Sequence, residues 1–154
     1  MAVALDRAGA DGLVLFNRFL HPDLDTDRLR GVSGVTLSSP NEARVPRTWI
    51  AVLRDKVEAS LAATTGVETE EDVVKYILAG ADVVMTASSL IRHGTQHARR
   101  LIDGLESWLD RKAITLDQAR GMLAVPRGTD AGAYQRAGYV DALTKAQSTY
   151  GSLR

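Results

Sequence analysis

Two short segments rich in small and hydroxyl-bearing residues are the strongest candidates for chemistry in this chain. The first has the sequence AATTGV at positions 62–67, and the second has the sequence TASS at positions 86–89. Small side chains let a ligand approach the backbone N–H groups, and the hydroxyls of Thr64 and Ser88 can add hydrogen bonds. This pattern is typical of a cradle for a phosphate group. Two ordinary tight turns between a strand and a helix are the alternative interpretation.

Asn17 is a third candidate, because it directly follows the apolar run LVLF at positions 13–16. At the end of a strand, a buried side-chain amide can present both a donor and an acceptor to a planar ligand. A loop asparagine that caps local backbone is the alternative interpretation.

Two patterns resemble metal-binding motifs, and neither has the full set of residues that its metal requires. Aspartates alternate at positions 23, 25 and 27, but a calcium loop starting at Asp23 needs glycine sixth and glutamate twelfth, where this chain has Arg28 and Gly34. His93 and His97 have the spacing of two zinc ligands on a helix, but no third ligand is evident. We therefore predict a solvated turn at 21–27 and no metal site. The chain has no cysteine, which excludes disulfides, thiolate metal sites and a cysteine nucleophile.

The elements around these candidates form a series of strand and helix units. The segments AGAD at 8–11 and at 79–82 each lead into a short apolar run, at 12–17 and 83–87. In both, a helix is expected to stop at the glycine, and an apolar run without polar alternation is typical of a strand covered on both faces. Positions 57–63 are a weaker candidate strand. Strands of this kind belong in a parallel sheet.

Helices are predicted between these strands. Thr69 is expected to cap a helix that ends at Ala79, with carboxylates in its first turn and Val73, Val74, Ile77 and Leu78 buried. Pro46 suits the first turn of a helix through position 56, with Trp49, Ile50 and Leu53 inward. Thr95 is expected to cap a helix to about position 111. Alternating strands and helices indicate right-handed βαβ units.

The predicted fold is α/β, the C-terminal portion of a (βα)8 TIM barrel with three parallel strands and their helices. A full barrel takes about 250 residues, and this chain has 154. We expect a partial barrel over 1–112 and a C-terminal helical extension over 113–154, with helices at about 115–122 and 130–147. Positions 1–8 look like the last two turns of a helix, which favours a chain that begins inside a larger domain. A genuine N-terminal helix is the alternative.

Composition narrows the classes of partner. Lysine plus arginine (19) balances aspartate plus glutamate (19), so no field of one sign indicates a nucleic-acid or membrane partner. The longest apolar run is too short to span a bilayer, and charged residues interrupt the N-terminus where a signal peptide would be apolar. These observations predict a cytoplasmic protein.

Several segments, in order, resemble the dihydroorotate dehydrogenase-like flavoproteins. GADGLVLFNRF at 9–19, and LSSP at 37–40 leading to RTWI at 47–50, resemble the region of that family's sixth strand. Positions 62–90 are similar to its seventh and eighth strands, and RHG at 92–94 and positions 114–121 fit its C-terminal end. The resemblance covers nearly the whole chain and is poorest over 123–129. It implies an FMN-containing (βα)8 barrel that oxidises dihydroorotate to orotate in pyrimidine synthesis.

The resemblance also implies a set of ligand contacts. The FMN contacts are Ala63, Thr64, Thr65 and Gly66 after the seventh strand, Ala87 and Ser88 after the eighth, and Ser38 near a flavin-contacting loop; Asn17 matches an asparagine that binds the pyrimidine substrate. Thr65 stands where the family often has a second glycine. A Cβ there can crowd the phosphate or disfavour a positive φ.

The resemblance leaves the catalytic base unassigned. In that family the base (a cysteine or serine) and the lysines that contact the flavin come from earlier strands, and nothing in this chain corresponds to strands one to five. We therefore assign no catalytic residue and expect no activity from this chain alone. The alternative is a catalytically inactive half-barrel that binds a phosphate ligand or completes another chain. An open sheet leaves an unpaired edge, which predicts self-association or a complementing barrel half. A lyase or isomerase acting on a sugar phosphate is a more distant third hypothesis, which the segment at 17–18 and the C-terminal region disfavour.

Overall fold

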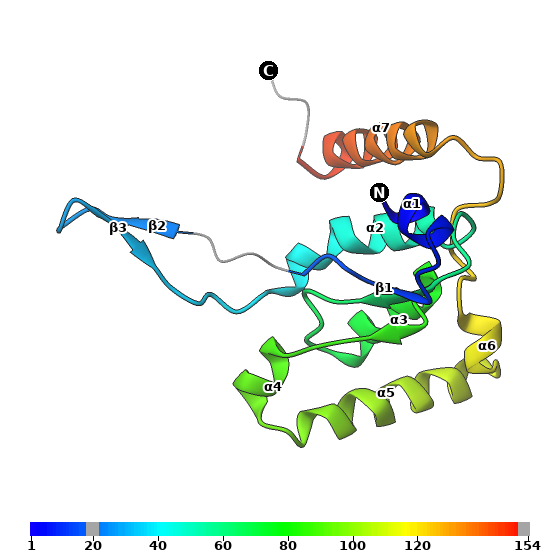
Figure 1. Cartoon of the computed structure of the whole chain (residues 1–154), viewed down its shortest axis with the longest axis horizontal. Helices are drawn as coiled ribbons and strands as arrows, with labels where there is room; N and C mark the ends of the chain where they lie inside the picture. The colour runs from blue at the N-terminus through cyan, green and yellow to red at the C-terminus, as the bar shows by residue number, and fades with distance from the viewer. Residues whose placement is uncertain (18–21, 151–154) are drawn as a thin grey trace. The chain divides into compact units, whose positions relative to one another are not determined.

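The computed structural model describes residues 1–17 and 22–150, and it divides the chain into two compact units, Met1–Ala124 and Val125–Arg154. Figure 1 shows the elements of the chain. In the first unit they are α1 (Ala2–Arg7), β1 (Gly12–Leu15), β2 (Pro22–Asp25), β3 (Arg30–Ser33), the 3-10 helix η1 (Pro40–Ala43), α2 (Arg44–Leu53), β4 (Ser60–Ala63), α3 (Glu70–Ala79), β5 (Val83–Val84), α4 (Ser88–His93), α5 (His97–Lys112) and α6 (Leu116–Ala119). The second unit holds α7 (Ala131–Tyr150). The predicted boundary between positions 112 and 113 stays a prediction.

The first unit is built on a three-stranded parallel sheet with the order β1-β4-β5. Leu13 pairs with Leu61, and Val14 pairs with Ala62, which pairs in turn with Val83. Along the chain, α2 comes between β1 and β4, and α3 comes between β4 and β5. The predicted α/β class and the three parallel strands are thus confirmed.

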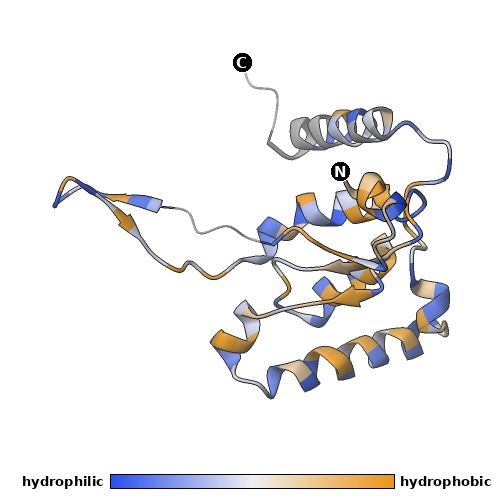
Figure 2. Cartoon of the chain, in the orientation of Figure 1, coloured by the Kyte–Doolittle hydropathy of each residue, from blue (hydrophilic) through white to orange (hydrophobic). Residues whose placement is uncertain are grey.

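The sheet has one covered and one open face. Leu13, Leu61 and Ala63 point to the covered face and are at most 6% exposed. Residues paired in register project to the same face of a parallel sheet, so Val14 and Val83 share the other face. These two valines are 63% and 50% exposed. Figure 2 shows the strands of this sheet as largely hydrophobic, and it shows hydrophobic and hydrophilic residues alternating along α5.

The prediction for α3 is confirmed at both ends. Thr69 is its N-cap and forms a capping box with Asp72, and Gly80 ends the helix in the left-handed conformation at φ 112°. The buried set differs in part, because Val74 and Ile77 are buried as predicted but Tyr76 is also fully buried. A tyrosine hydroxyl inside a core needs a partner, and that partner lies in the candidate site.

Three local predictions are wrong. Trp49 is 39% exposed, whereas Ile50 is buried as predicted and α2 also buries Ala51 and Val52. Gln96 rather than Thr95 occupies the N-cap position of α5, and a separate short helix, α4, precedes it. Of the segment 21–27 predicted as a solvated turn, Pro22–Asp25 are instead strand β2, which pairs with β3 in an antiparallel hairpin; residues 26 and 27 lie in the turn of that hairpin as predicted, and position 21 is outside the described residues. Asp25 stabilises the turn of that hairpin by accepting hydrogen bonds from the amides of residues 27 and 28.

In the second unit, α7 is capped by a carboxylate. Asp130 accepts hydrogen bonds from the amides of Gly132 at 3.1 Å and Ala133 at 3.0 Å. These two bonds stabilise the charged form and lower the pKa of Asp130 below its usual value. Across the described ranges of both units, no helix has the length and apolar character needed to cross a membrane.

Candidate functional site

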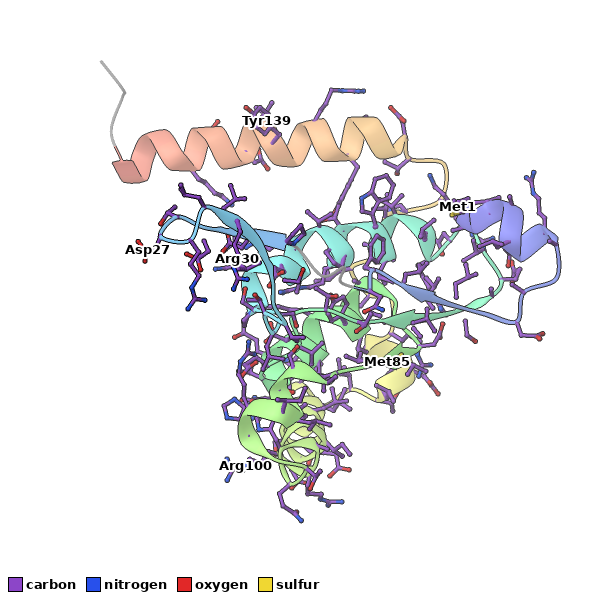
Figure 3. The ribbon with its side chains drawn as sticks, turned by 60° about the vertical axis from the view of Figure 1, so that its left-hand side comes forward. Met1, Asp27, Arg30, Met85, Arg100 and Tyr139 are labelled. Atoms are coloured by element: carbon purple, nitrogen blue, oxygen red, sulfur yellow. The ribbon has the colours of Figure 1, made fainter. Side chains whose placement is uncertain are left out.

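Both candidate phosphate-binding segments lie at the same edge of the sheet. β4 ends at Ala63 and β5 ends at Val84, and the two strands run in parallel. The amide of Met85 donates to the Ala63 carbonyl at 2.8 Å, which extends the pairing into the turns. Met85 is labelled in Figure 3. The carboxyl ends of parallel strands meet at one edge, where binding sites of α/β folds form.

Ser38 joins the two turns. Its hydroxyl accepts a hydrogen bond from the Gly66 amide at 3.3 Å and donates to Ser88 Oγ at 3.0 Å. The Ser38 amide also donates to Ser88 Oγ, at 3.1 Å. Because Ser88 Oγ accepts two hydrogen bonds here, its own proton remains available to donate. The structure therefore brings Ser38, Gly66 and Ser88 together in one hydrogen-bonded chain.

The first turn has an unusual backbone. Thr65 and Gly66 both have positive φ, at 80° and 71°. A β-branched residue rarely adopts this conformation, and the strain persists only where the surroundings enforce it. The Thr65 hydroxyl donates to the Phe16 carbonyl at 2.6 Å, and Phe16 also has positive φ, at 68°. Thr65 thus adopts the left-handed conformation even though it has a Cβ, which was expected to disfavour a positive φ.

Gly66 is required by the protein's own packing. A Cβ there would lie 2.7 Å from the Ser39 carbonyl oxygen and 2.8 Å from the Ala43 Cβ. The turn therefore packs directly against η1. The need for glycine at this position comes from that close approach and from the positive φ.

The second turn is fixed by hydroxyls. The Thr86 hydroxyl donates to the Val67 carbonyl at 3.0 Å and lies 2.9 Å from Ser89 Oγ. Ser89 is fully buried. The sequence predicted Ala87 and Ser88 as contacts here, and these neighbours hold the backbone of Ala87 and Ser88 against the first turn.

Tyr76, in α3, contacts the first turn through its hydroxyl group. The sequence analysis did not identify it as a site residue. Its hydroxyl, which carries one proton, lies within hydrogen-bonding distance of two carbonyl oxygens, those of Thr64 at 3.0 Å and Thr65 at 2.8 Å, which share it. Burial raises the pKa of Tyr76, so the hydroxyl stays protonated and donates. The predicted residue Thr64 thus contributes its carbonyl to the fixing of the turn.

Asn17 lies at the same edge but is exposed. It follows Phe16, directly after the end of β1, and β1 is parallel to β4. The prediction placed a buried amide there, and the burial part is wrong. The position at the shared edge agrees with the prediction, while the role of Asn17 stays a prediction.

An ion-pair cluster borders the site. Glu68 pairs with Arg92 at 2.6 Å and with His93 at 2.5 Å, and Arg92 also donates to the carbonyls of Leu37 and Ser38 at 3.1 and 2.8 Å. Burial alone raises the pKa of Glu68, but the hydrogen bonds from His93 and Arg92 outweigh it and lower the pKa below 4.5. Arg92 therefore ties the backbone that carries Ser38 to α4.

The donor chemistry of the two turns fits an anionic group. Positions 62–67 and 86–90 contain no charged side chain, and the carboxylate that follows the first turn in sequence, Glu68, is paired with Arg92. The Ser38–Ser88 chain and the left-handed turn present neutral O–H and N–H donors, which suit a phosphate. A cavity of about 200 Å³ borders the two turns at Val67 and Thr86 and is otherwise lined by apolar side chains, among them Val84 and Leu101.

Comparison with known proteins gives a consistent family. No family model matches the chain. The dihydroorotate dehydrogenase B (NAD(+)) catalytic subunit of Shouchella clausii is 28% identical over 122 residues, which are 74% of this chain and 38% of that protein. The subunit of the same name from Halalkalibacterium halodurans is 34% identical over 94 residues, 58% of this chain and 30% of that protein.

Solved structures give the same answer. Two crystal structures of the dihydroorotate dehydrogenase of Eimeria tenella, one in complex with ferulenol and one ligand-free, match with TM-scores of 0.63 and 0.65. Their sequence identities are 25% and 26%, and each match covers 81% of this chain but only 34% and 36% of those chains. The chain thus spans less than half the length of these relatives. Over that length, the resemblance to the dihydroorotate dehydrogenases, which are oxidoreductases, is confirmed by both sequence and structure.

Proposed function

We propose that this chain supplies the FMN phosphate site of a dihydroorotate dehydrogenase-like barrel, and that its three strands are part of a (βα)8 barrel. The observation that supports the proposal is the hydrogen-bonded chain from the Gly66 amide through Ser38 to Ser88, which joins the two turns at one edge. FMN, when bound, would supply the hydride acceptor for dihydroorotate, which becomes orotate on loss of one hydride and one proton.

In this proposal, the residues of this chain bind the phosphate and the pyrimidine and orient them. Gly66, Ser38 and Ser88 hold the phosphate, together with the backbone of Ala63, Thr64, Thr65 and Ala87. Asn17, exposed at the same edge, contacts the pyrimidine through its amide group. The proton-abstracting group is not among the residues that we assign.

The phosphate can be tested separately from the ring system. Titration of the purified chain with FMN and with riboflavin, which lacks the phosphate, measures both affinities by quenching of flavin fluorescence. Charge-assisted hydrogen bonds to the phosphate predict a preference for FMN of about tenfold or more. Equal affinity for the two flavins would contradict the proposal.

The alternative is an inactive half-barrel that completes another chain, and one observation favours it. Val14, Val83 and Met85 are 63%, 50% and 43% exposed on an open sheet face. Apolar surface of this kind favours association. Addition of dihydroorotate to the FMN-loaded chain tests whether this chain alone is catalytic. Bleaching of the flavin absorbance would show catalysis by this chain alone, whereas we expect no bleaching. Sedimentation velocity should then show self-association, and a monomer at every concentration would contradict self-association.

A further inference from the structure

Tyr76 is the largest fully buried side chain of the first unit whose polar atom points at the candidate site. The ring lies in α3, and none of its surface is exposed. The guanidinium of Arg47 lies over the ring, 5.7 Å from its centroid, and Arg47 is in turn 3.5 Å from Asp72. The ring is therefore held on one side by a cation that is itself anchored, and the hydroxyl has a defined position.

The hydroxyl contacts two successive carbonyls of the strained turn, at 3.0 Å for Thr64 and 2.8 Å for Thr65. All peptide bonds of the described chain are trans, so the C=O and N–H of each peptide unit point in opposite directions. The N–H groups of those same two peptide units belong to Thr65 and Gly66. With their carbonyls held toward Tyr76, both amides are turned away from α3.

The contact at Gly66 agrees with this direction. Its amide donates to the Ser38 hydroxyl, on the side of the turn opposite to Tyr76. The positive φ values of Thr65 and Gly66 need surroundings that enforce them. The Tyr76 hydroxyl enforces them from the α3 side, while the Thr65 hydroxyl does so through Phe16.

We propose that Tyr76 is a positioning residue, whose hydroxyl turns the amides of Thr65 and Gly66 toward the phosphate; this inference rests on the proposed function. The hydroxyl does not touch the ligand. It acts by fixing the direction of two backbone donors before the ligand arrives, and prior fixing of donors increases affinity.

The test compares Tyr76→Phe with the unsubstituted chain in the FMN and riboflavin titrations. The variant removes one oxygen and keeps the ring. We expect the affinity for FMN to fall by about fivefold, the size expected for one hydrogen bond, and the affinity for riboflavin to stay unchanged. A purely structural role would weaken the binding of both flavins equally. Ile77→Val, a buried change in the same helix, is the matched control and should leave the preference for FMN unchanged.

The outcomes separate the two proposals. If the unsubstituted chain prefers FMN and Tyr76→Phe keeps the full preference, the inference is wrong and the proposed function stands. If the unsubstituted chain shows no preference, the proposed function fails, and the inference fails with it.

A second measurement holds even if Tyr76→Phe does not fold. Titration of the unsubstituted ¹⁵N-labelled chain with inorganic phosphate should shift the amide resonances of Thr65 and Gly66 more than those of α3. Unmoved resonances at both residues would overturn the inference.

Discussion

The amides at the two edges of the parallel sheet differ in the groups that accept their hydrogen bonds. At the amino edge, carboxylates accept the amides: Asp6 accepts from Ala59 at 2.8 Å, and Asp82 accepts from Leu61 at 2.9 Å. At the carboxyl edge, the neutral hydroxyl of Ser38 accepts the turn amide. A carboxylate that is bonded to an amide repels a further anion from that amide. A neutral hydroxyl in the same place has no net charge and does not repel the anion. The comparison teaches that the Gly66 turn, whose amide is bonded to a neutral hydroxyl, is better suited to phosphate than the amides of Ala59 and Leu61, which are bonded to carboxylates.

The largest expected effect is a loss of stability in Asp82→Ala, a variant at the amino edge, without a loss of the preference for FMN. Asp82 is 2.7 Å from Arg54 and 3.6 Å from Arg120, so Asp82→Ala leaves two partly buried guanidinium groups without this carboxylate. We expect the free energy of unfolding, measured by urea denaturation, to fall by about 3 kcal/mol. The preference for FMN over riboflavin should persist in the folded variant.

Asp117→Ala is the control for that variant. Asp117 also pairs with Arg120, at 2.8 Å, but its side chain is 87% exposed. Removal of an exposed partner should change the unfolding free energy by less than about 1 kcal/mol. Equal losses in the two variants would show that Asp82 has no special role at the amino edge.

Gly66→Ala tests the packing of the carboxyl edge. The added Cβ meets the Ser39 carbonyl at 2.7 Å, and the positive φ adds strain. We expect the unfolding free energy to fall by about 2 kcal/mol and FMN binding to weaken, because the turn must move. Gly31→Ala is the control, since its Cβ would have no atom within 4 Å. A Gly66→Ala variant as stable as Gly31→Ala would contradict the close packing.

Thr65→Val removes the hydroxyl but keeps the branched shape. The lost hydrogen bond to the Phe16 carbonyl, 2.6 Å long, should lower the unfolding free energy by about 1 kcal/mol. Thr65→Ser retains the hydroxyl and should stay close to the unsubstituted chain in thermal denaturation. If serine and valine are equally destabilising, the link between β1 and β4 does not depend on this hydrogen bond.

The smallest effect is a pH dependence from Glu68. Its pKa in the folded chain is below 4.5, so its ion pairs stabilise the chain above that pH, and their contribution is lost as the pH falls through the folded pKa. Glu68→Gln should therefore flatten the fall in unfolding free energy between about pH 5 and pH 3. Glu71→Gln, which removes one carboxylate from the first turn of α3, provides the reference curve. Parallel curves for the two variants would contradict the ion-pair assignment.

Local signals in the sequence predict much of this fold. The N-cap Thr69 and the left-handed Gly80 are single-residue features, and they give both ends of α3. The shared edge of the two turns follows from two parallel strands. The hairpin of β2 and β3 was missed because its strands are only four residues long and expose most of their side chains, so they carry no clear apolar alternation.

The contacts that fix the site could not be predicted in the same way. Ser38 and Ser88 are 50 residues apart in sequence, and Thr65 and Phe16 are 49 apart. Such pairs depend on how the strands pack, and no local pattern encodes them. Tyr76 reads as one more apolar position of α3, and only the structure shows where its hydroxyl points.

A crystal structure of the chain soaked with FMN tests the central claim most directly. The account predicts the phosphate at the carboxyl edge, within hydrogen-bonding distance of the turn at Thr65 and Gly66 and also of Ser88. A phosphate bound at the amino edge, beside Arg54 and Arg120, or held by one turn alone, would contradict it.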